Sequence, residues 1–101
     1  MYINFDPHAG SEQASWRPGL VLTDESYNDK VGLCVICPVT TKPKGYAFEV
    51  LLPEGLAVEG VVLADHLKSV DWQEREARFM SRAPQDIIDI VLDKVADLLE
   101  M

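Results

Sequence analysis

Basic and hydroxyl-bearing side chains lie close together near the middle of the chain, where they could bind phosphate. No Asp or Glu occurs between Lys30 and Phe48, and this interval carries Lys42 and Lys44 just after Thr40. Clustered lysines favour binding to the negatively charged phosphate backbone of a nucleic acid. We therefore expect Lys42 and Lys44 to hold phosphates beside Thr40, although the formal net charge of the whole chain is −8.

A Cys-x-x-Cys pair, Cys34 and Cys37, could in principle bind zinc or carry redox chemistry. It lies in an apolar, β-branched run that predicts a strand, where residues three apart point to opposite faces with Cα atoms roughly 10 Å apart. That separation is too large for a disulfide, and one zinc ion needs both thiolates on the same side. His8 and His66 have no metal-ligand spacing, and no nucleophile elbow, phosphate-binding loop or zinc-protease motif occurs. We predict two ordinary thiols, no metal and no cofactor.

The composition indicates one small domain, which we assign to residues 1–101. The chain has 101 residues, of which 48% are hydrophobic, and a domain of this size can bury enough surface to fold alone. No apolar run approaches the roughly 18 residues of a membrane span, and no charged-then-apolar leader opens the chain. We therefore expect a cytoplasmic protein without membrane contact.

Short segments of alternating polarity, separated by turn residues, are typical of a small β-barrel or sandwich. The strands we expect are residues 2–6, 19–23, 32–40, 46–52, 60–64, 66–70 and 76–80, with a helical turn at 24–29. From Ile88 the apolar residues recur at the i, i+3, i+4 spacing of a helix face, and Pro84 fits the first helical position. We predict a C-terminal helix that packs on the barrel, with an acidic face in solvent. Its wide apolar face suggests a dimer contact.

Five segments, in this order along the chain, together resemble the MazF/PemK family of toxin–antitoxin ribonucleases over nearly the whole length. They are residues 10–14 with the pair 17–18, then 38–41, 44–49, 60–65 and 68–72. The resemblance implies a mainly β fold, a small SH3-like β-barrel of the CcdB/PemK type with short helices and one C-terminal α-helix. It also implies a homodimer that cuts single-stranded RNA, including mRNA, at short motifs without a metal, which stops translation and growth. The implied partner is a MazE-like antitoxin whose extended acidic segment covers the RNA groove.

The resemblance also gives roles to individual residues. The essential arginine of the family matches Arg17, and its essential threonine matches Thr40. Taken alone, Arg17 would fit a surface ion pair and Thr40 an ordinary strand residue, but the family register favours catalytic roles. Residues 10–15 match the mobile flap beside the family's active site, where we expect Glu12 and Gln13 to read base edges of the RNA.

Metal-free RNA cleavage explains why these residue types are needed. The 2′-hydroxyl attacks the adjacent phosphate, and DNA lacks that hydroxyl. Negative charge gathers on the phosphoryl oxygens in the transition state, where preorganised donors usually make the largest catalytic contribution. A guanidinium is a planar fork of donors that matches phosphate, and a threonine hydroxyl adds another donor. We expect Arg17 and Thr40 to stabilise that charge, with a general acid role for Arg17 left open.

The resemblance does not assign the base that accepts the 2′-hydroxyl proton. The family residue before the arginine is often histidine, but this chain has Trp16, whose ring could stack on an RNA base. Asp65 matches an aspartate that acts as base in another branch, although Leu63 stands where that branch has an arginine. His66 stands where glutamine is frequent, and histidine side chains titrate near neutrality. Asp65 and His66 are therefore candidate auxiliary bases; the alternatives are a turn cap for Asp65 and an outward-facing position for His66.

Two non-catalytic alternatives remain at this point. Relatives with this barrel inhibit DNA gyrase by binding it, and a bare SH3-like interaction module is also compatible with the strands. The presence of Arg17, Thr40 and the flap segment favours the nuclease, because a binding protein does not need them. Family members carry several residues before their first strand, whereas this chain opens within its first expected strand. We therefore expect either a natively short start or a truncated form.

Overall fold

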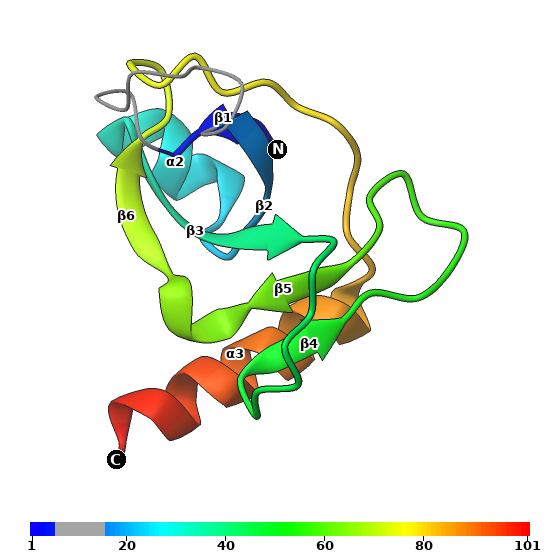
Figure 1. Ribbon diagram of the computed structural model, residues 1–101. Coiled ribbons are helices and arrows are strands. Elements are labelled where there is room, and N and C mark those ends of the chain that lie inside the picture. Colours follow the sequence, from blue (N-terminus) through cyan, green and yellow to red (C-terminus); the bar gives the residue numbers. More distant parts are fainter. Residues whose placement is uncertain (6–15) are drawn as a thin grey trace.

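The long apolar strand β3 (Leu33–Thr40) organises the part of the chain that this computed structural model describes, residues 1–5 and 16–101. On one edge it pairs with β2 (Trp16–Val21), and on the other with β6 (Lys68–Asp71) and then β5 (Val61–Leu63). β1 (Tyr2–Asn4) adds to β2, and β4 (Glu49–Leu51) adds to β5, all antiparallel (Figure 1). The mainly β prediction is confirmed.

The sheet is strongly curved because β6 and β5 pair with successive halves of β3. β6 pairs along Leu33–Ile36 and β5 along Val39–Thr40, and the 3-10 turn η1 (Ala64–His66) joins the two strands at the corner. Within the described residues no pairing joins β1 to β4, so the sheet does not close into the predicted SH3-like barrel. The two outer strands, β1 and β4, have three residues each.

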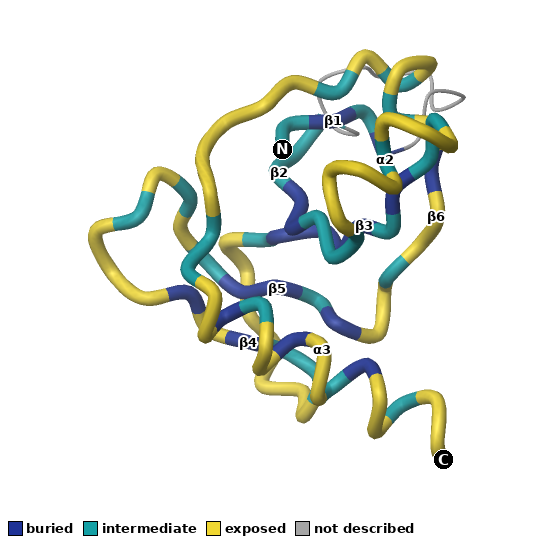
Figure 2. Tube along the Cα trace, turned by 180° about the vertical axis from the view of Figure 1, so that it is seen from behind, coloured by how far each residue is buried: buried dark blue, intermediate teal, exposed yellow. Residues whose placement is uncertain are grey.

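Alternate residues of β3 enter two separate apolar clusters. Cys34 and Ile36 pack with β1 and β6, whereas Cys37 and Val39 pack with β5 and with α3 (Gln85–Leu99). Figure 2 shows this burial along β3 and β5 and on one side of α3. Both thiols are free and buried in different clusters, so Cys34 and Cys37 lie on opposite faces of β3, as predicted.

The C-terminal helix α3 covers one of these clusters with Ile87, Val91 and Val95, all buried. It begins one residue later than predicted, because Pro84 is the N-cap with an extended ψ of 141°. In the part of the chain that the structure describes, no helix is both long and apolar enough to cross a membrane.

Several predicted boundaries are wrong in ways that local chemistry explains. β2 begins at Trp16 rather than Gly19, since the residue before Pro18 favours an extended backbone. The helical turn at 24–29 is a full helix, α2 (Glu25–Val31), capped by the Asp24 carboxylate and ended by Gly32 at φ 78°.

The other predicted strands differ as well. Residues 46–52 form the shorter β4 (Glu49–Leu51), and β6 begins at Lys68 because His66 belongs to η1. Residues 76–80 make a single bridge, Tyr2 with Arg78, in place of the predicted strand. Glu76 has a positive φ of 55°, which interrupts a regular strand there.

Candidate active site

Arg17 and Thr40 lie at the same end of the β2–β3 pair. Backbone pairing between the strands covers Gly19–Val21 and Ile36–Pro38, so each candidate lies two residues beyond it, on its own strand. Both residues are half-buried. The structure therefore places the two expected catalytic residues at one end of a shared strand pair, as a joint site requires.

The Thr40 hydroxyl is oriented by the turn that follows β3. Its Oγ1 accepts a hydrogen bond from the Lys42 amide at 3.2 Å. Because a hydroxyl has one proton and two lone pairs, this contact leaves the proton free to be donated elsewhere. The backbone of Thr40 is held by its pairing with Val61 in β5.

A glycine lies against the backbone of Thr40. Gly60 has a φ of 117°, and a Cβ built on it would lie 2.2 Å from the Thr40 carbonyl oxygen. No side chain fits in that space, and an L-residue is strained at this φ. Gly60 therefore allows the close approach that sets the end of β3.

We expect Gly60→Ala to lower the free energy of unfolding by about 2 kcal/mol or more and to displace the backbone of Thr40. The reason is the clash with the Thr40 carbonyl, which forces the end of β3 to move. Gly55→Ala is the matched control, because Gly55 has a φ of 89° but nothing within 4 Å of its added Cβ. Chemical denaturation of both variants measures the difference, and equal destabilisation would show that the contact at Thr40 has no effect of its own.

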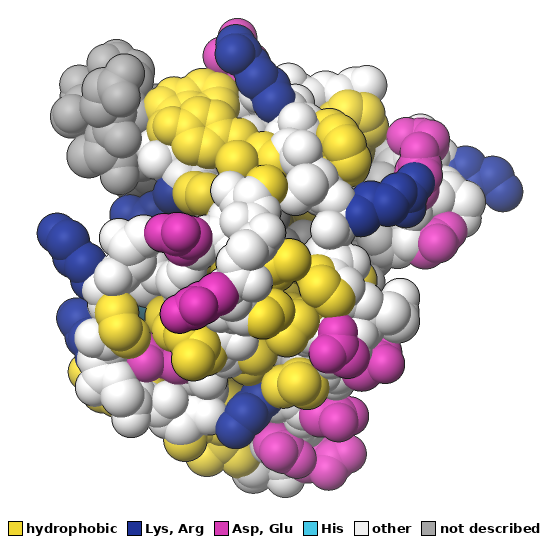
Figure 3. Space-filling model, turned by 90° about the vertical axis from the view of Figure 1, so that its right-hand side faces the viewer, with side chains coloured by type: hydrophobic (Ala, Val, Ile, Leu, Met, Phe, Trp, Pro, Cys, Tyr) yellow, Lys and Arg dark blue, Asp and Glu magenta, His cyan; other side chains and the backbone are white. Residues whose placement is uncertain are grey.

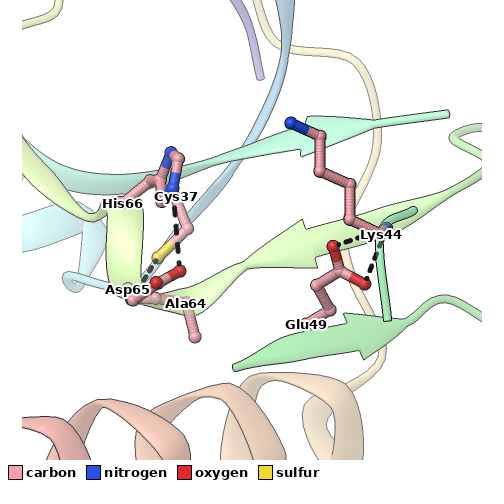
Figure 4. A network of polar contacts seen from close by, with 6 residues as sticks. All are labelled: Cys37, Lys44, Glu49, Ala64, Asp65 and His66. Atoms are coloured by element: carbon pink, nitrogen blue, oxygen red, sulfur yellow. Dashed lines mark hydrogen bonds and ion pairs between the residues drawn. The ribbon is translucent and has the colours of Figure 1, made fainter. Parts of the chain in front are cut away.

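The loop after Thr40 presents two exposed lysines on an ordered backbone. The Glu49 carboxylate accepts hydrogen bonds from the Lys44 amide at 3.0 Å and the Gly45 amide at 2.9 Å. From α3, the Lys94 ammonium donates to the Ala47 carbonyl at 2.8 Å. Figure 4 shows the Lys44 side chain pointing away from the Glu49 carboxylate, which contacts only its backbone. The lysine predicted to bind phosphate therefore keeps its charge directed outward.

Asp65 and His66 lie in η1, beside the middle of β3. The His66 Nε2 and an Asp65 oxygen are 3.9 Å apart, and the side chains are 59% and 36% exposed. The Cys37 thiol faces this turn, 3.9 Å from the Ala64 carbonyl (Figure 4). Burial, and to a smaller degree the Asp65 charge, raise the pKa of Cys37 to about 11, so this thiol is unreactive at neutral pH. Since Thr40 is three residues beyond Cys37, about 10 Å along a strand, the candidate bases lie at a different point along β3.

Trp16 begins β2 and stacks on Tyr2, with ring centroids 5.4 Å apart and planes at 23°. Both rings are half-buried. Because consecutive strand residues point to opposite faces, we expect a base stacked on Trp16 to lie on the other face of β2 from the Arg17 side chain. The expected base-reading residues Glu12 and Gln13, and His8, lie outside the described residues.

Two basic residues that sequence reasoning missed converge on the end of β1. The Arg75 guanidinium donates to the Phe5 carbonyl at 2.5 Å, and the Lys68 ammonium donates to the same oxygen at 3.4 Å. Lys68 also lies over the Phe5 ring, 5.7 Å from its centroid. The sequence could have pointed to Lys68, because this residue belongs to one of the segments that carry the family resemblance.

No group of three or more His, Cys, Asp or Glu that could hold a metal ion is found in residues 1–5 and 16–101.

A largely apolar groove of about 860 Å³ lies between β2, the segment after β4 and the start of α3. Figure 3 shows apolar side chains gathered in the middle of a face, with charged ones around them. The apolar residues that line the groove include Leu56, Val58, Phe79, Ala83, Ile88 and Leu92. Phe79 and Leu92 are exposed, which leaves apolar surface open to solvent at its rim.

Comparison with known proteins gives consistent matches over nearly the whole chain. Residues 1–99 match a family described as PemK-like, MazF-like toxin of type II toxin–antitoxin system. The chain is 40% identical over 99 residues to the endoribonuclease toxin MazF of Escherichia coli, covering 98% of this chain and 88% of that protein. It is 31% identical over 102 residues to the Escherichia coli endoribonuclease PemK, covering 96% of this chain and 76% of that protein.

Solved structures agree with these matches. The crystal structure of MazF from Deinococcus radiodurans has a TM-score of 0.89 and 50% identity, covering 99% of this chain and 91% of that one. A chain of the MazE–MazF crystal structure from the same organism has a TM-score of 0.85 and 45% identity, covering 99% and 89%.

Proposed function

The chain belongs to the family of PemK-like, MazF-like toxins of type II toxin–antitoxin systems, and we propose that it cuts single-stranded RNA through the RNA's own 2′-hydroxyl, without a metal ion. Relatives at 40% and 31% identity are endoribonucleases, so this toxin is an RNA-cleaving enzyme. That finding favours the nuclease over the gyrase-inhibitor and interaction-module alternatives.

The observation that carries the mechanism is the placement of Arg17 and Thr40 at one end of the β2–β3 pair. The 2′-oxygen forms a bond to phosphorus as the bond to the 5′-oxygen breaks, which leaves a 2′,3′-cyclic phosphate and a 5′-hydroxyl. A base takes the 2′-hydroxyl proton, and the departing 5′-oxygen receives a proton. The Arg17 guanidinium and the Thr40 hydroxyl proton donate to the phosphoryl oxygens where charge builds up.

Asp65 and His66 stay candidates for an auxiliary base. Their exposure keeps both side chains accessible to solvent and substrate, but their place beside Cys37 is about 10 Å along β3 from Thr40. We expect Asp65→Asn or His66→Gln to lower the cleavage rate by about ten-fold or more if that residue takes the proton. Single-turnover cleavage at several pH values measures this, and full activity in both variants would remove the two residues from the mechanism.

Lys42 and Lys44 are proposed to bind phosphates of the flanking nucleotides, since both are exposed just past Thr40. Lys42→Ala is expected to make the dependence of log affinity on log salt shallower by about 0.7, the value for one phosphate contact on a single strand. Lys30 is an exposed lysine on α2, and as a control Lys30→Ala should leave the slope unchanged. A titration of RNA binding at several salt concentrations compares the two, and equal slopes in both variants and the unmodified protein would place Lys42 off the RNA path.

The proposal extends to partners and compartment. MazF of Deinococcus radiodurans has been solved with MazE, and we assign to this toxin an antitoxin whose acidic segment competes with RNA for Arg17, Lys42 and Lys44. The apolar groove and its exposed rim, Phe79 and Leu92, support a homodimer, which light scattering on the purified protein tests. Cytoplasmic RNA is the substrate that fits this role.

A direct test incubates the purified protein with mixed-sequence single-stranded RNA and excess EDTA. The proposal predicts cuts at a limited set of short motifs that persist in the chelator. Intact RNA would overturn the proposal, and inhibition of gyrase supercoiling by the same preparation would support the binding-protein alternative.

A further inference from the structure

The loop between β3 and β4 carries two phosphate-binding candidates on the backbone that Glu49 holds. The half-buried Glu49 accepts hydrogen bonds on both carboxylate oxygens. Oε2 accepts from the Lys44 amide at 3.0 Å, and Oε1 accepts from the Gly45 amide at 2.9 Å and from the Lys44 amide at 3.3 Å. Glu49 is the first residue of β4, and its backbone pairs with Leu63 in β5. A rigid strand thus supports the loop through a charged acceptor, and hydrogen bonds of this kind are stronger than neutral ones.

The negative charge of Glu49 and its hydrogen bonds have opposite effects on the affinity of the protein for RNA. An anionic side chain near the path of a polyanion weakens binding through repulsion. The same carboxylate orders the backbone whose Lys44 ammonium points away from it (Figure 4). A carboxylate beside the lysines is therefore useful to an RNA-binding loop only if the ordering outweighs the repulsion.

We propose that Glu49 is a positioning residue, which orients the loop of Lys42 and Lys44 for RNA phosphates through the Lys44 and Gly45 amides. This inference rests on the proposed nuclease function. Glu49 does not touch the substrate. It lowers the cost of ordering the lysines when RNA binds, and preorganisation of this kind raises affinity.

The two effects of Glu49 give Glu49→Gln an outcome of definite sign. If positioning dominates, the KM for RNA rises about three- to ten-fold, the range of one net hydrogen bond, and kcat stays unchanged. If Glu49 acts only as a nearby negative charge, the same variant tightens binding and KM falls. Glu54→Gln removes an equal charge from an exposed residue after β4 and is the matched control.

A double-mutant cycle tests whether Glu49 acts through the lysines. In the background Lys42→Ala with Lys44→Ala, Glu49→Gln is expected no longer to raise KM, because the groups it orients are gone and only the relief of repulsion is left. An undiminished effect in that background would overturn the proposal.

Amide hydrogen exchange supplies a readout that does not depend on activity. Glu49→Gln should speed exchange at Lys44 and Gly45, while the amides of β3 and β5 keep their protection. Unchanged exchange at both amides would contradict the positioning role even if KM rose. A protein that does not cleave RNA at all would instead refute the proposed function, so the two failures are distinguishable.

Discussion

Replacing Arg17 with alanine is expected to lower the rate of RNA cleavage by about 100- to 1,000-fold, the range seen when one transition-state donor is removed. In the proposed mechanism the guanidinium supplies two parallel N–H donors to phosphoryl oxygens at the moment when their charge grows. Arg17→Lys should recover little of the activity, because an ammonium is a point charge and cannot reproduce the fork. Single-turnover rates on one RNA oligonucleotide containing a mapped cut site measure both variants.

The Arg17 result needs a control for folding, because Arg17 lies in β2 and pairs with Ile3. Circular dichroism and the denaturation midpoint of Arg17→Ala show whether the variant is folded under the conditions of the assay. A folded Arg17→Ala protein that cuts RNA at the original rate would remove the arginine from the active site.

Replacing Thr40 with valine is expected to lower the cleavage rate by about 100-fold, because valine has the same shape but no hydroxyl to donate. The lost acceptor for the Lys42 amide should cost little stability, since this hydrogen bond is exposed and the amide can turn to water. The measurement is again the single-turnover rate, accompanied by the KM for RNA.

Thr40→Ser separates the hydroxyl from the rest of the side chain. Serine keeps both the acceptor for the Lys42 amide and the proton for phosphate, so the rate should stay within about ten-fold of the unmodified protein. Equal activity in the valine and serine variants would mean that Thr40 only shapes the end of β3.

The periodicity of apolar residues and local sequence signals predicted much of this fold. The alternation in β3 was enough to separate Cys34 from Cys37, and the helical spacing after Ile88 predicted α3. The strand expected at 76–80 was wrong, because alternation cannot reveal the positive φ at Glu76 that breaks the ladder. Whether the outer strands β1 and β4 meet depends on the curvature of the whole sheet, which local sequence does not determine.

The residue types of the candidate site were predictable from the sequence, but the contacts that hold these residues in place were not. Arg17 and Thr40 came from a family resemblance, and the lysines from an interval free of acidic residues. The contact of Gly60 with Thr40 joins residues far apart in sequence, and no periodicity reports such close backbone approaches. The contact of Glu49 with two amides depends on the conformation of a loop, which composition leaves open.

The chemical ends of the RNA products test the central claim most directly. Mass spectrometry of an oligonucleotide cut in the presence of EDTA should find a 2′,3′-cyclic phosphate on one fragment and a 5′-hydroxyl on the other. The same oligonucleotide with a single 2′-deoxy substitution at the cut site should remain whole. A 3′-hydroxyl with a 5′-phosphate, or cleavage at the 2′-deoxy site, would contradict attack by the 2′-hydroxyl.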